Sequence, residues 1–220
     1  MNYYEIKEKD YFTGTRHDII SLLPKKSDQK VLEIGAGGGD TLVYIKKNNL
    51  AQEVVGFELF KIPNSNQENE LIDSFIFGDI ENENIPVQEN YFDVIILADV
   101  LEHLIDPWAA FNKIIKYLKP SGQILVSLPN IREINTLLKV FFLGDFRYND
   151  GGVLDKTHLR FFCKKNMKKL LETGNTKIVK SFPSFKLNKQ QKRRHLYNLI
   201  SFGLFENFLT FQFLFVIEKR

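Results

Sequence analysis

The sequence contains little cysteine and no long apolar run, and each shortage excludes a class of protein. Its one cysteine, Cys163, cannot form an intramolecular disulfide or a multi-cysteine metal site. No stretch approaches the roughly 18 uninterrupted apolar residues of a membrane-spanning helix. The polar residues 1–7 are unlike a signal peptide. We therefore expect a soluble, cytoplasmic protein with no transmembrane segment.

Acidic residues are scarce in the second half of the chain, where basic residues accumulate. Residues 1–110 hold 9 Lys and Arg against 20 Asp and Glu, and residues 111–220 hold 21 against 7. A basic half can attract a phosphorylated acceptor or a membrane surface, unless folding interleaves the two halves. The basic run at 189–194 has no interleaved aromatic residues, so we expect no nucleic-acid partner.

Short apolar runs alternate with amphipathic segments, a pattern that predicts an α/β protein with a mostly parallel sheet. The run at 93–98 is apolar without alternation, as expected of a central strand covered on both faces. Asp106 as N-cap and Pro107 at the first helical position predict a helix that stops before residues 119–122. The strands that we expect span 30–34, 53–58, 74–77, 92–98, 123–128, 176–181 and 208–217, with further helices at 134–143 and 164–173.

A glycine-rich loop, Gly35 to Gly39, lies between the first expected strand and a helix that starts near Asp40. Glycines allow a sharp turn and let a ligand approach main-chain N–H groups closely. The helix N-terminus behind such a loop favours a negatively charged group. The loop predicts a nucleotide-binding turn, although a glycine-rich surface turn would look similar.

Two nucleotide-binding signatures are incomplete in this loop. The dinucleotide fingerprint needs a third glycine where this chain has Asp40, and a Walker-type phosphate loop needs Gly-Lys-Ser/Thr. The Tyr-x-x-x-Lys pair of many nicotinamide oxidoreductases occurs only at Tyr3 and Lys7, before the loop. These absences argue against an NAD(P)-dependent sugar-nucleotide oxidoreductase, which we keep as the first alternative.

Acidic residues stand at the ends of the next two expected strands. Glu58 ends the second strand, where a carboxylate can accept hydrogen bonds from both ribose hydroxyls. Asp79 follows the third strand and can accept from an adenine amino group, while Ile80 packs against the ring. An exposed glutamate and an ordinary Gly-Asp turn are the alternatives.

Together these motifs resemble the class I S-adenosylmethionine (SAM) dependent methyltransferases. The resemblance is carried by residues 31–37, Glu58, 78–80 and 91–95, and is extended by 99–104 and 118–123. It implies a Rossmann-like, seven-stranded sheet of order 3-2-1-4-5-7-6 with helices on both faces. The last strand, at 208–217, would be antiparallel. SAM is the implied cofactor, and its implied binding residues are Glu33, Gly35, Ala36, Gly37, Glu58, Asp79, Ile80 and Asp99.

Within this family Glu33 contacts the methionine part of the cofactor, directly or through water. A narrower resemblance, at 106–109, 127–130 and 154–162, is to a bacterial subgroup often associated with cell-surface glycan assembly. This resemblance narrows the setting more than the substrate. Our interpretation is O-methylation of a small or glycan-related acceptor. A non-catalytic SAM-binding protein is the second alternative.

We interpret residues 1–220 as one methyltransferase domain without a linker. Its expected parts are an N-terminal cover segment (1–29), a cofactor-binding core (30–129), an insertion or lid (130–162) and a C-terminal helix with strands (163–220). In the cover segment Tyr4, Tyr11 and Arg16 precede the first strand, and aromatic faces there would favour the positive charge of a sulfonium.

His103 and His158 are the candidate catalytic residues. Either imidazole could remove a proton from an acceptor hydroxyl, because histidine titrates near neutrality. Arg160 could hold a phosphate or carboxylate of the acceptor, or hydrogen-bond within the lid. The four histidines show no ligand spacing that suggests a metal, so none is expected. We interpret the apolar stretch at 137–142 and the basic run at 189–194 as a core helix and a solvated charge run. The alternative is that they mark a lipid-linked or membrane-adjacent acceptor.

Overall fold

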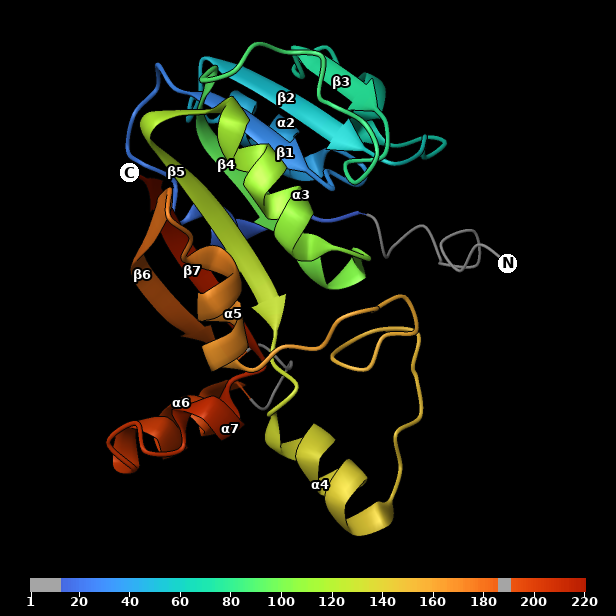
Figure 1. Ribbon diagram of the computed structural model, residues 1–220, viewed down its shortest axis with the longest axis vertical. Coiled ribbons are helices and arrows are strands. Elements are labelled where there is room, and N and C mark those ends of the chain that lie inside the picture. Colours follow the sequence, from blue (N-terminus) through green and yellow to red (C-terminus); the bar gives the residue numbers. More distant parts are fainter. Residues whose placement is uncertain (1–12, 186–190) are drawn as a thin grey trace.

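The computed structural model describes residues 13–185 and 191–220 (Figure 1). Residues Tyr3, Tyr4, Tyr11 and the start of the basic run lie outside the described residues. Seven strands form one sheet. They are β1 Lys30–Ile34, β2 Glu53–Glu58, β3 Ser74–Phe77, β4 Phe92–Ala98, β5 Leu118–Pro129, β6 Thr176–Ser184 and β7 Gln212–Lys219.

The strand order is β3-β2-β1-β4-β5-β7-β6. Strands β1 to β5 pair in parallel, and β7 runs antiparallel to both β5 and β6. This topology confirms the predicted Rossmann-like fold. In such a sheet the carboxyl ends of the parallel strands meet at one edge, and β1 and β4 mark the point where the strand order reverses.

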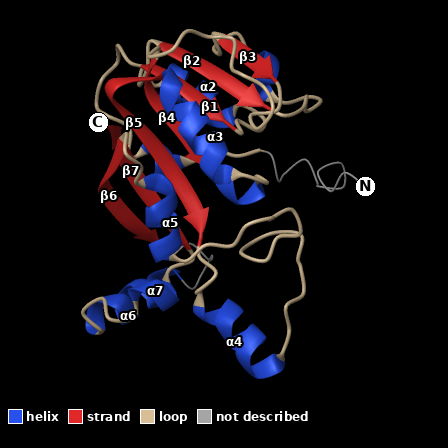
Figure 2. Cartoon of the chain, viewed as in Figure 1, coloured by secondary structure: helices blue, strands red, loops and turns tan. Residues whose placement is uncertain are grey.

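Helices cover both faces of the sheet (Figures 1 and 2). On one face α3 and α5 pack against a cluster that includes Phe111 and Leu170; on the other, α1 and α2 bury Ile19 and Leu42. The helices are α1 His17–Ile20, α2 Asp40–Lys47, α3 Pro107–Ile114, α4 Ile134–Leu143, α5 Lys164–Leu171, α6 Gln191–Ile200 and α7 Glu206–Leu209, with short 3-10 turns η3 Asn66–Glu68, η4 Leu101–His103 and η5 Ile115–Tyr117.

The first four strands begin and end at the predicted residues. The three later strands differ, and β6 continues to Ser184, beyond its predicted end at residue 181. Strand β5 starts at Leu118 because that residue already pairs with Phe92. The register then shifts, and regular pairing begins at Gln123. Strand β7 starts at Gln212, which pairs with the last residues of both neighbours, Pro129 and Ser184. The residues before it form α7, so the β-prone run at 208–217 marks the strand but not its first residue.

Helix α3 begins as predicted, with Asp106 accepting a hydrogen bond from the Ala109 N–H at 3.0 Å and Pro107 at the first helical position. Helix α5 ends at Leu171, two residues before the predicted end, because Thr173 bonds to Thr176 in the turn that follows.

The insertion after β5 departs from the sheet and then returns to it. Helix α4 projects away from the sheet (Figure 1), so the expectation of a core helix is wrong: Phe141 is 81% exposed. The chain then returns to η4, where the N–H groups of Leu159 and Arg160 both donate to the Glu102 carbonyl at 2.9 Å. In residues 13–185 and 191–220, no helix has the length and apolar character needed to cross a membrane.

Candidate functional site

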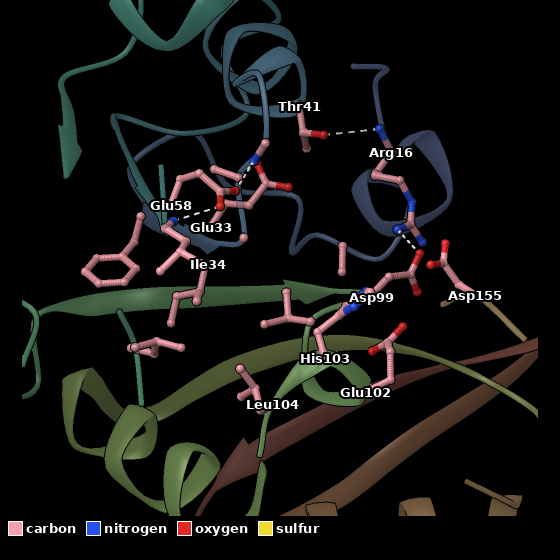
Figure 3. Close-up of a pocket in the computed structure, with 18 of the residues that line it drawn as sticks. Arg16, Glu33, Ile34, Thr41, Glu58, Asp99, Glu102, His103, Leu104 and Asp155 are labelled. Carbon is pink, nitrogen blue, oxygen red and sulfur yellow. Dashed lines mark hydrogen bonds and ion pairs between the residues drawn. The ribbon is translucent and has the colours of Figure 1, made fainter. Parts of the chain in front are cut away.

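A cavity of about 430 Å³ opens at the carboxyl ends of β1, β2 and β4. The glycine loop and the ends of β2 and β3 form one end of it, and η4 with the returning insertion forms the other. Figure 3 shows Glu33 and Glu58 at the first end, apart from Glu102, His103 and Asp155 at the second. The predicted site residues that line the cavity are Glu33, Gly35, Ala36, Gly37, Glu58, Asp79, Ile80, Asp99, His103 and His158.

The glycine loop turns through backbone conformations that favour glycine. Gly35 has a φ of 68° and Gly37 a φ of 51°. A Cβ at Gly35 would lie 2.6 Å from Cγ2 of Val100, so even alanine would be both strained and crowded there. The Gly35 N–H donates to the Phe57 carbonyl at 2.9 Å, which fixes the loop against β2. The loop therefore presents bare backbone to the cavity.

Glu58 links this loop to the end of β2. Its carboxylate accepts from the Gly37 N–H at 2.8 Å and from its neighbour Leu59 N–H at 2.7 Å. Burial raises the pKa of Glu58, and these two hydrogen bonds offset part of that rise. A carboxylate held in this way has a fixed position from which it can accept further hydrogen bonds.

Glu33 lies at the end of β1 and is 3% exposed. Its Oε2 has no hydrogen-bond partner among the described residues. Burial raises the pKa of Glu33 to about 8, although the positive charge of Arg16 acts against the rise. A hydrogen bond from Thr41 also acts against the rise. A buried acidic group with one unpartnered oxygen beside a cavity is suited to a cationic ligand group.

Arg16 joins the segment before α1 to the ends of β4 and β5. Its guanidinium donates to Asp99 at 2.7 Å and to the Ser127 hydroxyl at 3.1 Å, and its backbone N–H donates to the Thr41 hydroxyl at 3.2 Å. Burial lowers the pKa of Arg16, but the charges of Asp99 and Asp18 outweigh burial and raise it. The sequence indicated Arg16 as part of a cover segment but gave no sign of this ion pair.

Asp99 itself adopts a φ of 58°, which is uncommon for a residue other than glycine. Its carboxylate accepts from Arg16, from the Ser127 hydroxyl at 2.7 Å and from the Gln212 side chain. Asp99 thus lines the cavity with its charge already matched by Arg16. Strained backbone of this kind is often found at ligand sites.

The second end of the cavity brings two histidines together from distant parts of the chain. His103 Nδ1 lies 3.1 Å from the Thr157 carbonyl, and His158 Nδ1 lies 3.0 Å from the Val153 carbonyl. The ring centroids are 4.8 Å apart. Burial, with the neighbouring His158, lowers the pKa of His103 to about 4. His103 is therefore neutral at physiological pH.

Glu102 and Asp155 complete this end and were not singled out from the sequence. Glu102 is fully buried, and burial raises its pKa well above the ordinary value. Its Oε1 lies 4.0 Å from His158 Nε2. Asp155 Oδ1 accepts from the N–H and hydroxyl of Thr157. The place of Glu102 beside His103 in the 99–104 motif was the only available signal.

Three predicted residues remain to be placed. The Asp79 carboxylate accepts from the Glu81 N–H at 2.8 Å and from the Asn82 side chain at 2.7 Å, and the adjacent Ile80 is buried. Arg160 does not line the cavity. Its Nε instead donates to the Ile105 carbonyl at 3.1 Å, which ties the insertion to the loop after η4.

Known proteins resemble the chain both in sequence and in fold. Over 121 residues it is 32% identical to a phosphoethanolamine N-methyltransferase of Triticum aestivum, covering 51% of this chain and 23% of that protein. Over 103 residues it is 30% identical to the ubiquinone/menaquinone biosynthesis C-methyltransferase UbiE of Idiomarina loihiensis, covering 44% and 41%. The chain therefore spans less than half the length of these relatives.

Solved structures share the fold at lower identity. A SAM-dependent methyltransferase from Archaeoglobus fulgidus superposes with a TM-score of 0.61 at 19% identity, covering 100% of both chains. One from Mesorhizobium loti gives 0.59 at 15% identity, covering 93% and 96%. The family described as a methyltransferase domain matches residues 8–181, which include the glycine loop and both acidic strand ends. That match supports SAM as the cofactor, and it shows that the chain belongs to the methyltransferase domain family.

Proposed function

We propose that this chain transfers a methyl group from SAM to a hydroxyl group of a small or glycan-related acceptor. The observation that carries the proposal is the pairing of Glu33, buried and unsatisfied at Oε2, with two histidines in one cavity. Glu33 suits the cationic ammonium group of the amino-acid part of SAM, and the two histidines suit an acceptor hydroxyl that must lose its proton.

The residues present fit SAM at the first end of the cavity. Gly35 leaves no room for a Cβ and presents bare backbone. Glu33 would hold the ammonium group of the methionine part, and Glu58 would accept from the ribose hydroxyls. Asp79 and Ile80 would contact the adenine. When bound, SAM supplies an electrophilic methyl group on a positively charged sulfur.

The protein's part in the reaction is alignment, exclusion of water and control of one proton. A carbonyl oxygen can only accept a hydrogen bond, so both rings carry hydrogen on Nδ1, and Nε2 holds the lone pair when a ring is neutral, as that of His103 is. Either Nε2 can take the hydroxyl proton of an acceptor. Gly152, Asp155 and His158 form one wall of the cavity, so we propose that the insertion at 130–162 acts as its lid.

The class of acceptor is supported by fewer observations than the cofactor is. The relatives' names specify a nitrogen acceptor in one case and a carbon acceptor in the other, so the acceptor atom is not carried over from them. The two histidines beside the cavity favour an oxygen acceptor, and the motifs at 106–109, 127–130 and 154–162 favour a glycan setting. Arg160 is not part of this acceptor site, because its guanidinium binds the Ile105 carbonyl.

A membrane-adjacent acceptor is supported by an exposed apolar surface on α4 and the turn after α6. Phe141 is 81%, Phe142 71% and Phe202 99% exposed. The same helices carry the exposed basic residues Lys139, Lys192 and Arg193. Exposed apolar and basic side chains together favour a lipid surface. Sedimentation with anionic vesicles tests this: the wild type should pellet more than Phe141→Ser/Phe142→Ser, and equal recovery would argue against a membrane setting.

The enzymatic proposal is tested by incubating the protein with SAM labelled in the methyl group and fractionated cell extract. One fraction should take up label with the wild type and with Glu89→Ala, an exposed control, but not with Glu58→Ala. Binding of SAM without transfer to any fraction would favour a non-catalytic SAM-binding protein. NAD(P)H binding in a fluorescence titration, without SAM binding, would favour an oxidoreductase.

A further inference from the structure

Glu102, His103 and His158 form a cluster of ligand atoms at the acceptor end of the cavity. One atom from each residue lies within 4.8 Å of the others. Zinc–nitrogen and zinc–oxygen bonds are about 2.0–2.2 Å, so tetrahedral ligand atoms lie about 3.4 Å apart. Side-chain shifts of about 1 Å would bring the three atoms to that spacing. The sequence did not indicate this cluster, because His158 lies next to His103 only after the insertion has folded back to η4.

The orientation of both imidazoles suits metal binding. Each Nδ1 donates to a backbone carbonyl, Thr157 for His103 and Val153 for His158. That bond fixes the tautomer and places the lone pair on Nε2. Metal-binding histidines almost always donate their other ring N–H to a carbonyl or carboxylate in this manner. Two such rings with centroids 4.8 Å apart constitute a pre-oriented pair.

The burial of Glu102 is a second indication of a bound cation, independent of the orientation of the histidines. The side chain is 0% exposed, and neither carboxylate oxygen has a hydrogen-bond partner within the described part of the chain. Burying a carboxylate in this way is costly unless a positive charge compensates it. The guanidinium of Arg16 is engaged with Asp99 and Asp18 instead. His158 Nε2, a group of potential positive charge, lies 4.0 Å from Glu102 Oε1.

From this geometry we propose that Glu102, His103 and His158 bind one divalent transition-metal ion of the zinc class. Two imidazole nitrogens and one carboxylate oxygen favour zinc and its neighbours over magnesium or calcium, which prefer oxygen ligands. Three protein ligands leave a fourth position, and all three residues line the cavity, so that position faces the space for the acceptor.

The ion would hold the acceptor's hydroxyl and lower its pKa, a role that rests on the proposed methyl transfer. In that form of the protein the two Nε2 atoms bind metal, and the ion replaces the histidines as the group that activates the hydroxyl. Binding of the ion depends on the three side chains and not on whether the protein transfers a methyl group.

The inference is tested on tag-free protein that has been dialysed against a chelator and titrated with Zn²⁺ and with Co²⁺. The wild type should bind one equivalent, and Co²⁺ should give visible absorption bands of a site with nitrogen ligands. The Glu102→Gln and His158→Ala variants should bind at least about 100-fold more weakly. His17→Ala, at an exposed histidine outside the cluster, should bind as the wild type does.

Thermal unfolding provides the second readout. Zn²⁺ should raise the Tm of the wild type and of His17→Ala but not that of Glu102→Gln, whose neutral isosteric side chain should preserve the fold. Absence of stoichiometric binding, or undiminished binding by Glu102→Gln, would overturn the inference. S-adenosylhomocysteine binding by the metal-free protein separates this failure from failure of the methyltransferase proposal.

Discussion

The two ends of the cavity are built in different ways. At the cofactor end, the loop after β1 and the end of β2 place Gly35, Gly37 and Glu58 within a short span of chain. The loop's N–H groups donate to the Phe57 carbonyl and to the Glu58 carboxylate. At the acceptor end, η4 meets an insertion that returns to it, and Glu102 remains buried without a hydrogen-bond partner among the described residues. Local sequence therefore determines the cofactor end, whereas the acceptor end forms only when distant parts of the chain come together.

This difference predicts that substitutions at the two ends of the cavity will affect different kinetic quantities. Changes at the cofactor end should weaken cofactor binding. Changes at the acceptor end should slow transfer and leave cofactor binding intact.

The largest effect is expected at Gly35. Gly35→Ala places a Cβ 2.6 Å from Val100 on a backbone with a φ of 68°, so both strain and crowding oppose it. We expect a loss of stability of about 2 kcal/mol and a loss of S-adenosylhomocysteine binding of at least about 100-fold. Thermal unfolding and calorimetry measure both quantities. Gly174→Ala, which has no atom within 4 Å of its added Cβ, should change neither.

At the acceptor end, His103→Ala should lower kcat by about 100-fold or more, because it removes a group that activates the acceptor. The Kd for S-adenosylhomocysteine should change by less than about threefold, since the cofactor residues are untouched. Label transfer into the active extract fraction measures the first quantity, and calorimetry the second. If His103→Ala abolished cofactor binding, the two ends of the cavity would not be separable.

A smaller effect is expected from the pKa of Glu33. Burial raises this pKa from the ordinary value of 4.5 to about 8, so the folded chain holds a proton that the unfolded chain has released. The contribution to stability is therefore present at low pH and is lost as the pH rises towards 8. Binding an ammonium group favours the ionised carboxylate and must expel this proton.

Affinity for S-adenosylhomocysteine should accordingly rise between pH 6 and about pH 7.5, by at most about tenfold per unit. Calorimetry in buffers of different ionisation enthalpy would detect the released proton. In Glu33→Gln the affinity should be weaker and flat over this range. A pH-independent affinity in the wild type would show that Glu33 is already ionised.

Local patterns predicted the cofactor end and most of the sheet. The strands β1 to β4 are short, mostly apolar runs bounded by turns, which leave little freedom in their ends. The first residues of β5 and β7 depend on pairing with neighbouring strands, which no local pattern encodes. The exposure of α4 was open for a similar reason, because an amphipathic pattern does not identify what covers its apolar face.

The acceptor end was predicted only in part. His103 and His158 were recognised one at a time, but their approach depends on how the insertion returns to η4. Arg160 was expected near the acceptor, yet that same return directs its guanidinium to the Ile105 carbonyl. The ion pair of Arg16 with Asp99 joins residues 83 positions apart in the sequence.

Calorimetric titration with S-adenosylhomocysteine tests the central proposal most directly, because it requires no knowledge of the acceptor. The wild type and Glu89→Ala should each bind one equivalent. Glu58→Ala should bind at least about tenfold more weakly, since it loses the carboxylate that we propose binds the ribose. No heat with either SAM or S-adenosylhomocysteine would contradict the assignment of this cavity as a methyltransferase cofactor site.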